Sequence, residues 1–181
     1  MRKSFFYLFL ALTVIILVVL GYFWLNKEET KPPKTTVSSF EECVAGGNPV
    51  QESYPRRCSA NGKTFTEDIG NALDKQELIR LESPLPNQLV ESPLKIKGEA
   101  RGRWFFEASF PVKIVDSGGK ILGTAISSTT SEWTTDNFVP FTADLTFENS
   151  TTEKGKLILE KDNPSGLAEN ADSLEIPIKF K

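Results

Sequence analysis

The residue type used most often in acid–base and nucleophilic catalysis, histidine, is absent from this sequence. Its absence from the 181 residues excludes a histidine general base, Ser–His and Cys–His nucleophile pairs, and zinc held by imidazole. A Ser–Lys pair or two carboxylates would remain, but no motif brings such groups together. We therefore expect a protein that is not an enzyme and that needs no cofactor.

The two cysteines, Cys43 and Cys58, are the remaining reactive groups. In an exported chain two cysteines most simply pair, and this disulfide would add roughly 3 kcal/mol of stability through chain entropy. Free thiols and a metal site are the alternatives, although two cysteines without a second pair do not supply a tetrahedral set of ligands. We predict a small disulfide-closed module at residues 40–67.

Acidic and amide side chains gather in residues 162–172, where Asp162, Asn163, Glu169 and Asp172 offer oxygen atoms. Calcium binds carboxylates and carbonyls of this kind. Turn formation beside proline and glycine explains the same residue types, because Asp and Asn side chains hydrogen-bond the backbone of tight turns. We therefore predict a turn here and no metal site.

Four aromatic residues could form a surface for a glycan or a partner protein, since aromatic faces support both kinds of contact. Trp104 and Phe106 share the parity of the core positions of the strand described next, so we expect both to be buried. Phe105 must then point to the opposite face, and Trp133 has no clear inward assignment. Phe105 and Trp133 are therefore the predicted binding surface.

Most of these aromatic residues belong to the stretch around which the chain is organised, residues 98–116. From Trp104 to Ile114 the even positions are apolar, whereas Glu107 and Lys113 occupy odd ones. A two-residue period is typical of a half-buried strand. We expect this strand to be the core of a β domain.

Six further segments have the composition of strands. They are residues 78–82, 94–100, 121–128, 141–147, 157–161 and 174–180. Residues 116–120 form the turn of a hairpin between two of the strands. Seven strands in about 100 residues is the count of an immunoglobulin-like sandwich. We predict a mainly β fold of this class, with Pro111 and Pro177 at bulges or edge positions.

Residues 5–25 are almost entirely apolar. As a helix at ~1.5 Å per residue they span roughly 31 Å, which matches the hydrocarbon core of a bilayer. Tyr22 and Trp24 fit an interfacial aromatic belt, and Arg2 and Lys3 place the amino terminus in the cytoplasm. We predict an uncleaved single-pass anchor in the lipid bilayer, with a cleaved signal peptide as the alternative.

These boundaries divide the chain into a series of parts. They are a cytoplasmic tip at 1–4, a transmembrane anchor at 5–25, a flexible linker at 26–39, the cysteine module at 40–67, a connector at 68–79 and the sandwich at 80–181. Charged residues are nearly balanced, with 21 Lys+Arg against 24 Asp+Glu. We therefore expect no nucleic-acid partner.

Several blocks of the carboxyl-terminal part carry a family resemblance. They are residues 83–86, 92–94, 98–112, 136–142 and 161–166. In this order they resemble the immunoglobulin-like domain of bacterial spore germination, over residues 80–181. The resemblance implies an extracytoplasmic β-sandwich of bacterial envelope proteins, with no catalytic residues to carry over. Residues 40–65 are similar to a short two-cysteine motif of bacterial surface proteins.

Together these features predict a membrane-anchored bacterial cell-surface protein. Its immunoglobulin-like domain would serve as a non-catalytic binding or assembly module in the envelope, related to sporulation or germination. The alternatives are a structural spacer in a membrane complex and a module that binds wall glycan. The expected partners are the bilayer, through residues 5–25, and an envelope protein or cell-wall glycan.

Overall fold

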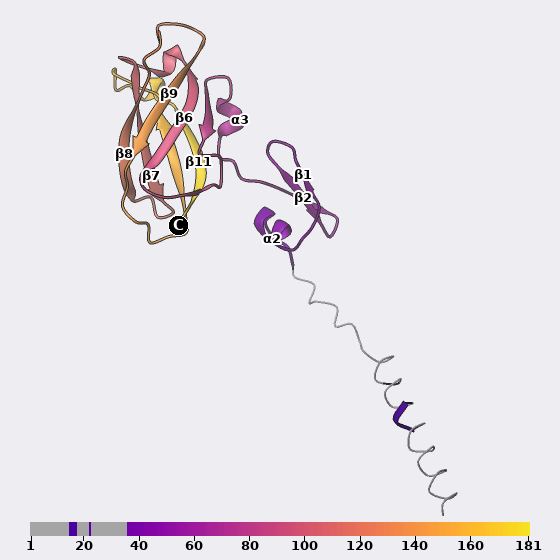
Figure 1. The fold of residues 1–181 in the computed structure, drawn as a ribbon. Helices are drawn as coiled ribbons and strands as arrows, with labels where there is room; N and C mark the ends of the chain where they lie inside the picture. Colours follow the sequence, from indigo (N-terminus) through magenta and orange to yellow (C-terminus); the bar gives the residue numbers. More distant parts are fainter. Residues whose placement is uncertain (1–14, 18–21, 23–35) are drawn as a thin grey trace, which may run out of the picture. The chain divides into compact units, whose positions relative to one another are not determined.

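The computed structural model describes residues 15–17, 22 and 36–181 (Figure 1). Residues Val37–Lys181 form one compact unit, and Met1–Thr36 are assigned to another. Ile15, Leu17 and Tyr22 are helical and their side chains are exposed. The predicted tip, most of the predicted anchor and most of the predicted linker lie outside the described residues. Within the described part, no helix is long and apolar enough to cross a membrane.

The compact unit begins with the predicted cysteine module. It contains the helix α2 (Phe40–Ala45) and three strands, β1 (Val50–Gln51), β2 (Arg57–Ala60) and β3 (Lys63–Thr66), which pair in that order. A disulfide joins Cys43 on α2 to Cys58 on β2, and neither cysteine is exposed to solvent. The predicted pairing is confirmed. Only a few other side chains, such as Phe40 and Ala60, complete this small core, so the cross-link is a large part of what holds it together.

A short helix, α3 (Ala72–Lys75), leads into the larger domain. Its strands are β4 (Ile79–Ser83), β5 (Leu89–Val90), β6 (Leu94–Arg101), β7 (Ser109–Asp116), β8 (Ile121–Ser128), β9 (Phe138–Leu145), β10 (Lys154–Glu160) and β11 (Ser173–Phe180). Two 3-10 turns, η1 (Gly102–Trp104) and η2 (Ala168–Asn170), interrupt the series. Each of the seven predicted strands has a counterpart here, and the two-residue strand β5 is additional.

The strands form one curled sheet in the order β4-β6-β9-β8-β7-β10-β11-β5. Neighbours are antiparallel except for β11 and β5, which are parallel. Strands β8 and β9 pair through a single residue pair, Ser128 with Thr142. The sheet turns over at this point, so that β4, β6 and β9 lie across a shared core from β7, β10 and β11. The predicted mainly β class is confirmed, with the two layers joined as one curled sheet.

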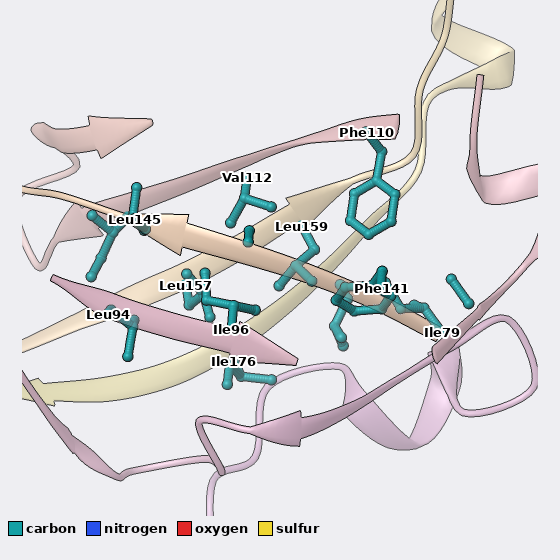
Figure 2. Close-up of a cluster of buried hydrophobic side chains, with 14 of the residues drawn as sticks. Ile79, Leu94, Ile96, Phe110, Val112, Phe141, Leu145, Leu157, Leu159 and Ile176 are labelled. Carbon is teal, nitrogen blue, oxygen red and sulfur yellow. The ribbon is translucent and has the colours of Figure 1, made fainter. Parts of the chain in front are cut away.

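The core lies between these two layers and follows the predicted alternation. On β6 the buried positions Leu94 and Ile96 alternate with exposed lysines. Figure 2 shows side chains of β6 and β9 pointing toward those of β7 and β10. The labelled examples are Leu94, Ile96, Phe141 and Leu145 from one layer and Phe110, Val112, Leu157 and Leu159 from the other. A two-residue period on both layers therefore builds a single core.

The predicted core strand does not begin at Trp104, because β7 starts only at Ser109. Strand β6 ends at Arg101, and a tight turn precedes β7, in which Glu107 and Ala108 have φ angles of 49° and 60°. On either side of this turn the backbones of Phe106 and Ser109 exchange two hydrogen bonds of 3.0 Å each. The turn shifts the side-chain parity, because the residues before it no longer continue the alternation of β7.

The aromatic residues before this turn therefore face differently from the prediction. Trp104 is buried as expected, at 1% exposure. Phe105 is 5% exposed and Phe106 is 43% exposed, so the predicted sides of these two residues are reversed. The Phe105 ring packs edge-on against Phe110, with 5.2 Å between the ring centroids.

Candidate functional site

The outer faces of the two layers differ in polarity. On β6 and β9 the outward side chains include Lys95 and Lys97 beside Thr142 and Asp144, all exposed. On the other layer, β8 exposes two large apolar side chains, Ile121 at 54% and Ile126 at 64%. A polar outer face needs no partner, whereas clustered exposed apolar side chains mark a contact surface.

We call this second surface the apolar outer face. It consists of the outward residues of β8, β7, β10 and β11, namely Ile121, Thr124, Ile126, Pro111, Lys113, Val115, Lys154, Lys156, Ile158, Glu160, Ser173, Glu175 and Pro177. The residues share one face because the inward positions between them belong to the core. Paired positions such as Pro111 and Ile126, or Val115 and Ile121, place apolar groups side by side on neighbouring strands.

A hollow of about 600 Å³ lies on the apolar outer face. Val115, Ile121, Ile158 and Pro177 supply its aliphatic lining, and lysine and carboxylate side chains stand around them. The face carries no aromatic side chain. The hollow therefore offers aliphatic contact and lacks the flat ring that a sugar stacks on.

The charges on this face are paired along it. Lys113 donates a hydrogen bond from Nζ to Oε1 of Glu160 at 2.5 Å, and Lys156 pairs with Glu175 at 3.1 Å. Surface pairs of this kind contribute little to stability. They do neutralise the face, so that burial of its aliphatic side chains is the main free energy a partner would gain.

The connector closes the edge of the sheet beside this face. The Asn71 side chain donates from Nδ2 to the Ser173 carbonyl at 2.9 Å and accepts at Oδ1 from the Glu175 amide at 2.8 Å. The Asn71 amide also donates to the Glu175 carbonyl at 3.2 Å. Gly70, with φ of +65°, makes this approach possible, because a Cβ there would lie 1.9 Å from the Glu175 carbonyl oxygen. This part of β11 therefore cannot add a further strand.

The cysteine module reaches the same region through α2. Glu41 pairs with Lys154 at 3.2 Å. A hydrogen bond from its own backbone amide and the ammonium of Lys154 lower the pKa of the Glu41 carboxyl. Farther along the chain, Glu67 receives two hydrogen bonds from Arg56, at 2.6 and 2.9 Å, and this pairing lowers the pKa of its carboxyl. The Glu41–Lys154 pair thus joins the module to β10, whereas the Arg56–Glu67 pair lies within the module.

The two predicted binding residues lie together, but on a different surface. Phe105 and Trp133 both line a hollow of about 310 Å³ beside Arg103 and Asp136. Trp133 is partly buried and packs against the main core. Because Phe105 is buried in that core, the predicted exposure of its ring is wrong. The hollow can offer a ligand mainly the free part of the indole ring.

Several polar residues after β10 bond to other groups of the chain, either within their own turn or on α3. Ser165 donates to Oδ1 of Asn163 at 2.6 Å, and Asn163 donates from Nδ2 to the Leu167 carbonyl at 2.8 Å. Asp172 pairs with Lys75 at 2.5 Å. Over the described part of the chain, no group of three or more metal-ligating side chains comes together.

Sequence reasoning missed the apolar outer face. A signal was present in β10, where Leu157, Ile158 and Leu159 are consecutive apolar residues. In a strand with two-residue alternation, such a run must place one apolar side chain outward. Ile114 and Val115 give the same signal in β7.

Comparison with known proteins gives one match. The model of a protein family described as an immunoglobulin-like domain of bacterial spore germination matches residues 78–168. No curated protein and no solved structure matches the chain. The matched region begins one residue before β4 and ends in η2, so it covers the strands of both layers except β11.

Proposed function

Because the chain belongs to the family of immunoglobulin-like domains of bacterial spore germination, we propose that it is a bacterial envelope protein whose domain is a non-catalytic binding or assembly module. The family links the domain to germination or sporulation. In this proposal the domain carries out no reaction and instead holds a partner protein in place.

The apolar outer face is the observation that carries the proposal. Ile121 and Ile126 are more than half exposed, and Ile121 lines a hollow together with Val115, Ile158 and Pro177. A single exposed isoleucine needs no explanation, but apolar residues gathered on one sheet face with their charges already paired favour a protein contact.

We further propose that the chain is anchored in the cell membrane. The apolar segment 5–25 has the length of a membrane span, and the charges before it favour a cytoplasmic amino terminus. The disulfide between Cys43 and Cys58 fits an oxidising compartment outside the cytoplasm. The immunoglobulin-like domain would then lie outside the membrane, where envelope partners are accessible.

Two alternatives rest on particular observations. The hollow at Trp133 supports binding of wall glycan, because a partly exposed indole can stack on a sugar ring. The connector fixed along β11 by Asn71 supports a structural spacer, because it would transmit position from one module to the next. We favour a protein partner, since the larger hollow is aliphatic and has no aromatic lining.

Photo-cross-linking tests the proposed function. A photoreactive amino acid replaces Ile121 in the full chain, produced in its bacterial cells, and the matched control replaces Lys97 on the polar outer face. We expect protein adducts from position 121 and few from position 97. Equal yields at the two positions, or no adduct at either, would contradict the proposed role of this face.

Sedimentation with purified cell-wall sacculi tests the glycan alternative. The full chain in mild detergent is compared with the variant Trp133→Ala. Saturable binding that weakens in the variant would support the glycan-binding function, whereas no binding by a folded chain would exclude it.

A further inference from the structure

A hollow of about 250 Å³ lies between η1 and the loop that follows β10. Two backbone hydrogen bonds fix its walls. The Asp162 amide donates to the Trp104 carbonyl at 3.1 Å, and the Lys161 amide donates to the Asp172 carbonyl at 2.8 Å. The residues that line the hollow are Leu78, Arg103, Trp104, Lys161 and Asp172. The hollow therefore shares no residue with the apolar outer face.

The indole N–H of Trp104 lacks a partner at this hollow. Trp104 is 1% exposed, and its Nε1 atom has no hydrogen-bond partner in the part of the chain that the structure describes. A buried donor without an acceptor destabilises a fold, and buried indole N–H groups usually find a partner. The hollow that Trp104 lines is therefore the place where an acceptor from outside the chain would bind.

The other polar groups of the hollow also need acceptors. Arg103 is exposed, and its guanidinium makes no hydrogen bond or ion pair with any residue that the structure describes. Lys161 donates one of its three ammonium hydrogens to the Asn170 carbonyl, at 3.2 Å. Asp172 is the carboxylate among the lining residues, and it already pairs with Lys75 at 2.5 Å. The hollow therefore carries positive charge and has donors left to satisfy.

We propose that this hollow binds a carboxylate, namely the free carboxyl end of a peptide. The planar guanidinium of Arg103 and the remaining donors of Lys161 match the two oxygens of a carboxylate. A single oxygen atom is small enough to reach the enclosed N–H of Trp104. Arg103 has no pairing to break, so its exposed side chain can turn to admit the ligand.

The size and the apolar lining of the hollow favour one terminal residue as the ligand. About 250 Å³ is below the roughly 300 Å³ at which sites for drug-sized molecules begin. Leu78 is half-buried, and together with the indole ring it offers apolar contact to a small side chain beside the carboxylate. This inference goes beyond the proposed function, because the two surfaces have no residue in common.

Proton–nitrogen NMR of the full chain in mild detergent, isotope-labelled at its tryptophan nitrogens, observes the Trp104 N–H directly. The chain has three tryptophans, and the variants Trp24→Phe and Trp133→Phe assign the other two indole signals. The probe is N-acetylalanine, and the control ligand is its amide, which has no negative charge. We expect a saturable shift of the Trp104 signal with the acid and no shift with the amide.

A substitution tests the role of the guanidinium. Arg103→Gln keeps a polar side chain and removes the charge, so we expect the dissociation constant for N-acetylalanine to rise at least about tenfold. Arg57→Gln is the matched control, because Arg57 is exposed on β2 and does not line the hollow. It leaves the dissociation constant unchanged. Thermal unfolding of each variant shows whether its domain is folded.

Three outcomes would overturn the inference. An unshifted Trp104 signal, or equal shifts with the acid and the amide, would overturn the carboxylate site. Unchanged binding by folded Arg103→Gln would overturn the place of the ligand. Equal or tighter binding of inorganic phosphate or of glucuronic acid would overturn the peptide end as the ligand. Each of these outcomes leaves the proposed function standing, because cross-linking from position 121 reports on the apolar outer face.

Discussion

The contact between the connector and β11 predicts a large effect of a small substitution, Gly70→Ala. A Cβ at this position would lie 1.9 Å from the Glu175 carbonyl oxygen, far inside van der Waals contact, so the backbone must separate. Separation breaks the hydrogen bonds that join Asn71 to Ser173 and Glu175. Three hydrogen bonds at roughly 1 kcal/mol each give a loss of about 3 kcal/mol, to which the positive φ adds about 1 kcal/mol.

The matched control for this variant is Gly166→Ala. Gly166 has φ of +66°, nearly that of Gly70, but a Cβ there meets nothing within 4 Å. It therefore carries the conformational cost alone, about 1 kcal/mol. A unit of this size loses roughly 3 °C in its unfolding midpoint per kcal/mol. The midpoint measured by circular dichroism should therefore fall by about 12 °C in Gly70→Ala and by about 3 °C in Gly166→Ala. Equal shifts would refute the close approach of the connector.

Three further predictions address other parts of the compact unit. Reduction of the disulfide should lower the free energy of unfolding by roughly 3 kcal/mol, measured by denaturant unfolding with and without reductant. Glu67→Gln should lower the free energy of unfolding at neutral pH, because it removes the carboxylate that Arg56 stabilises. The stability difference between the variant and the original chain should shrink as the pH falls through the lowered pKa of Glu67, since that carboxylate is then protonated in the original chain as well. A pH-independent difference in the denaturant midpoint would contradict this. Ala108→Gly should raise the midpoint of thermal unfolding slightly. Glycine relieves the backbone strain of alanine at φ of 60°, and this relief exceeds the entropic cost of glycine. A lowered midpoint would contradict the turn geometry.

The regular strands of the fold could be predicted from the sequence because their alternation is complete. In β6, Leu94 and Ile96 are buried while Lys95 and Lys97 are exposed, as the two-residue period requires. The strand β8 was predicted with its observed bounds, Ile121–Ser128, because a glycine-rich turn precedes it.

The turn before β7 could not be predicted in the same way. Two-residue turns with positive φ at both central positions strongly favour Asn-Gly or Asp-Gly, whereas Glu107 and Ala108 occupy this one. Tertiary contacts must therefore impose the conformation. Without that turn, counting parity assigns Phe105 and Phe106 to the wrong faces.

The apolar outer face depended on information that a list of strands lacks. Its residues come from β8, β7, β10 and β11, whose order in the sheet differs from their order in the chain. The outward apolar residues of each strand look unremarkable alone, and they form a surface only when Val115, Ile121 and Ile158 become neighbours. The pairing of Cys43 with Cys58 needed no such information, because two cysteines allow one partner each.

The central claim, that a protein covers the apolar outer face in the envelope, is tested most directly by radical footprinting of side chains. Labelling of Ile121 and Ile126 is compared between bacterial cells and the dilute full chain in detergent, with Leu85, which is 56% exposed and lies in the loop between β4 and β5, as the control. We expect the two isoleucines to be several-fold less labelled in cells while the leucine is unchanged. Equal labelling of the isoleucines in cells and in the dilute chain would contradict it.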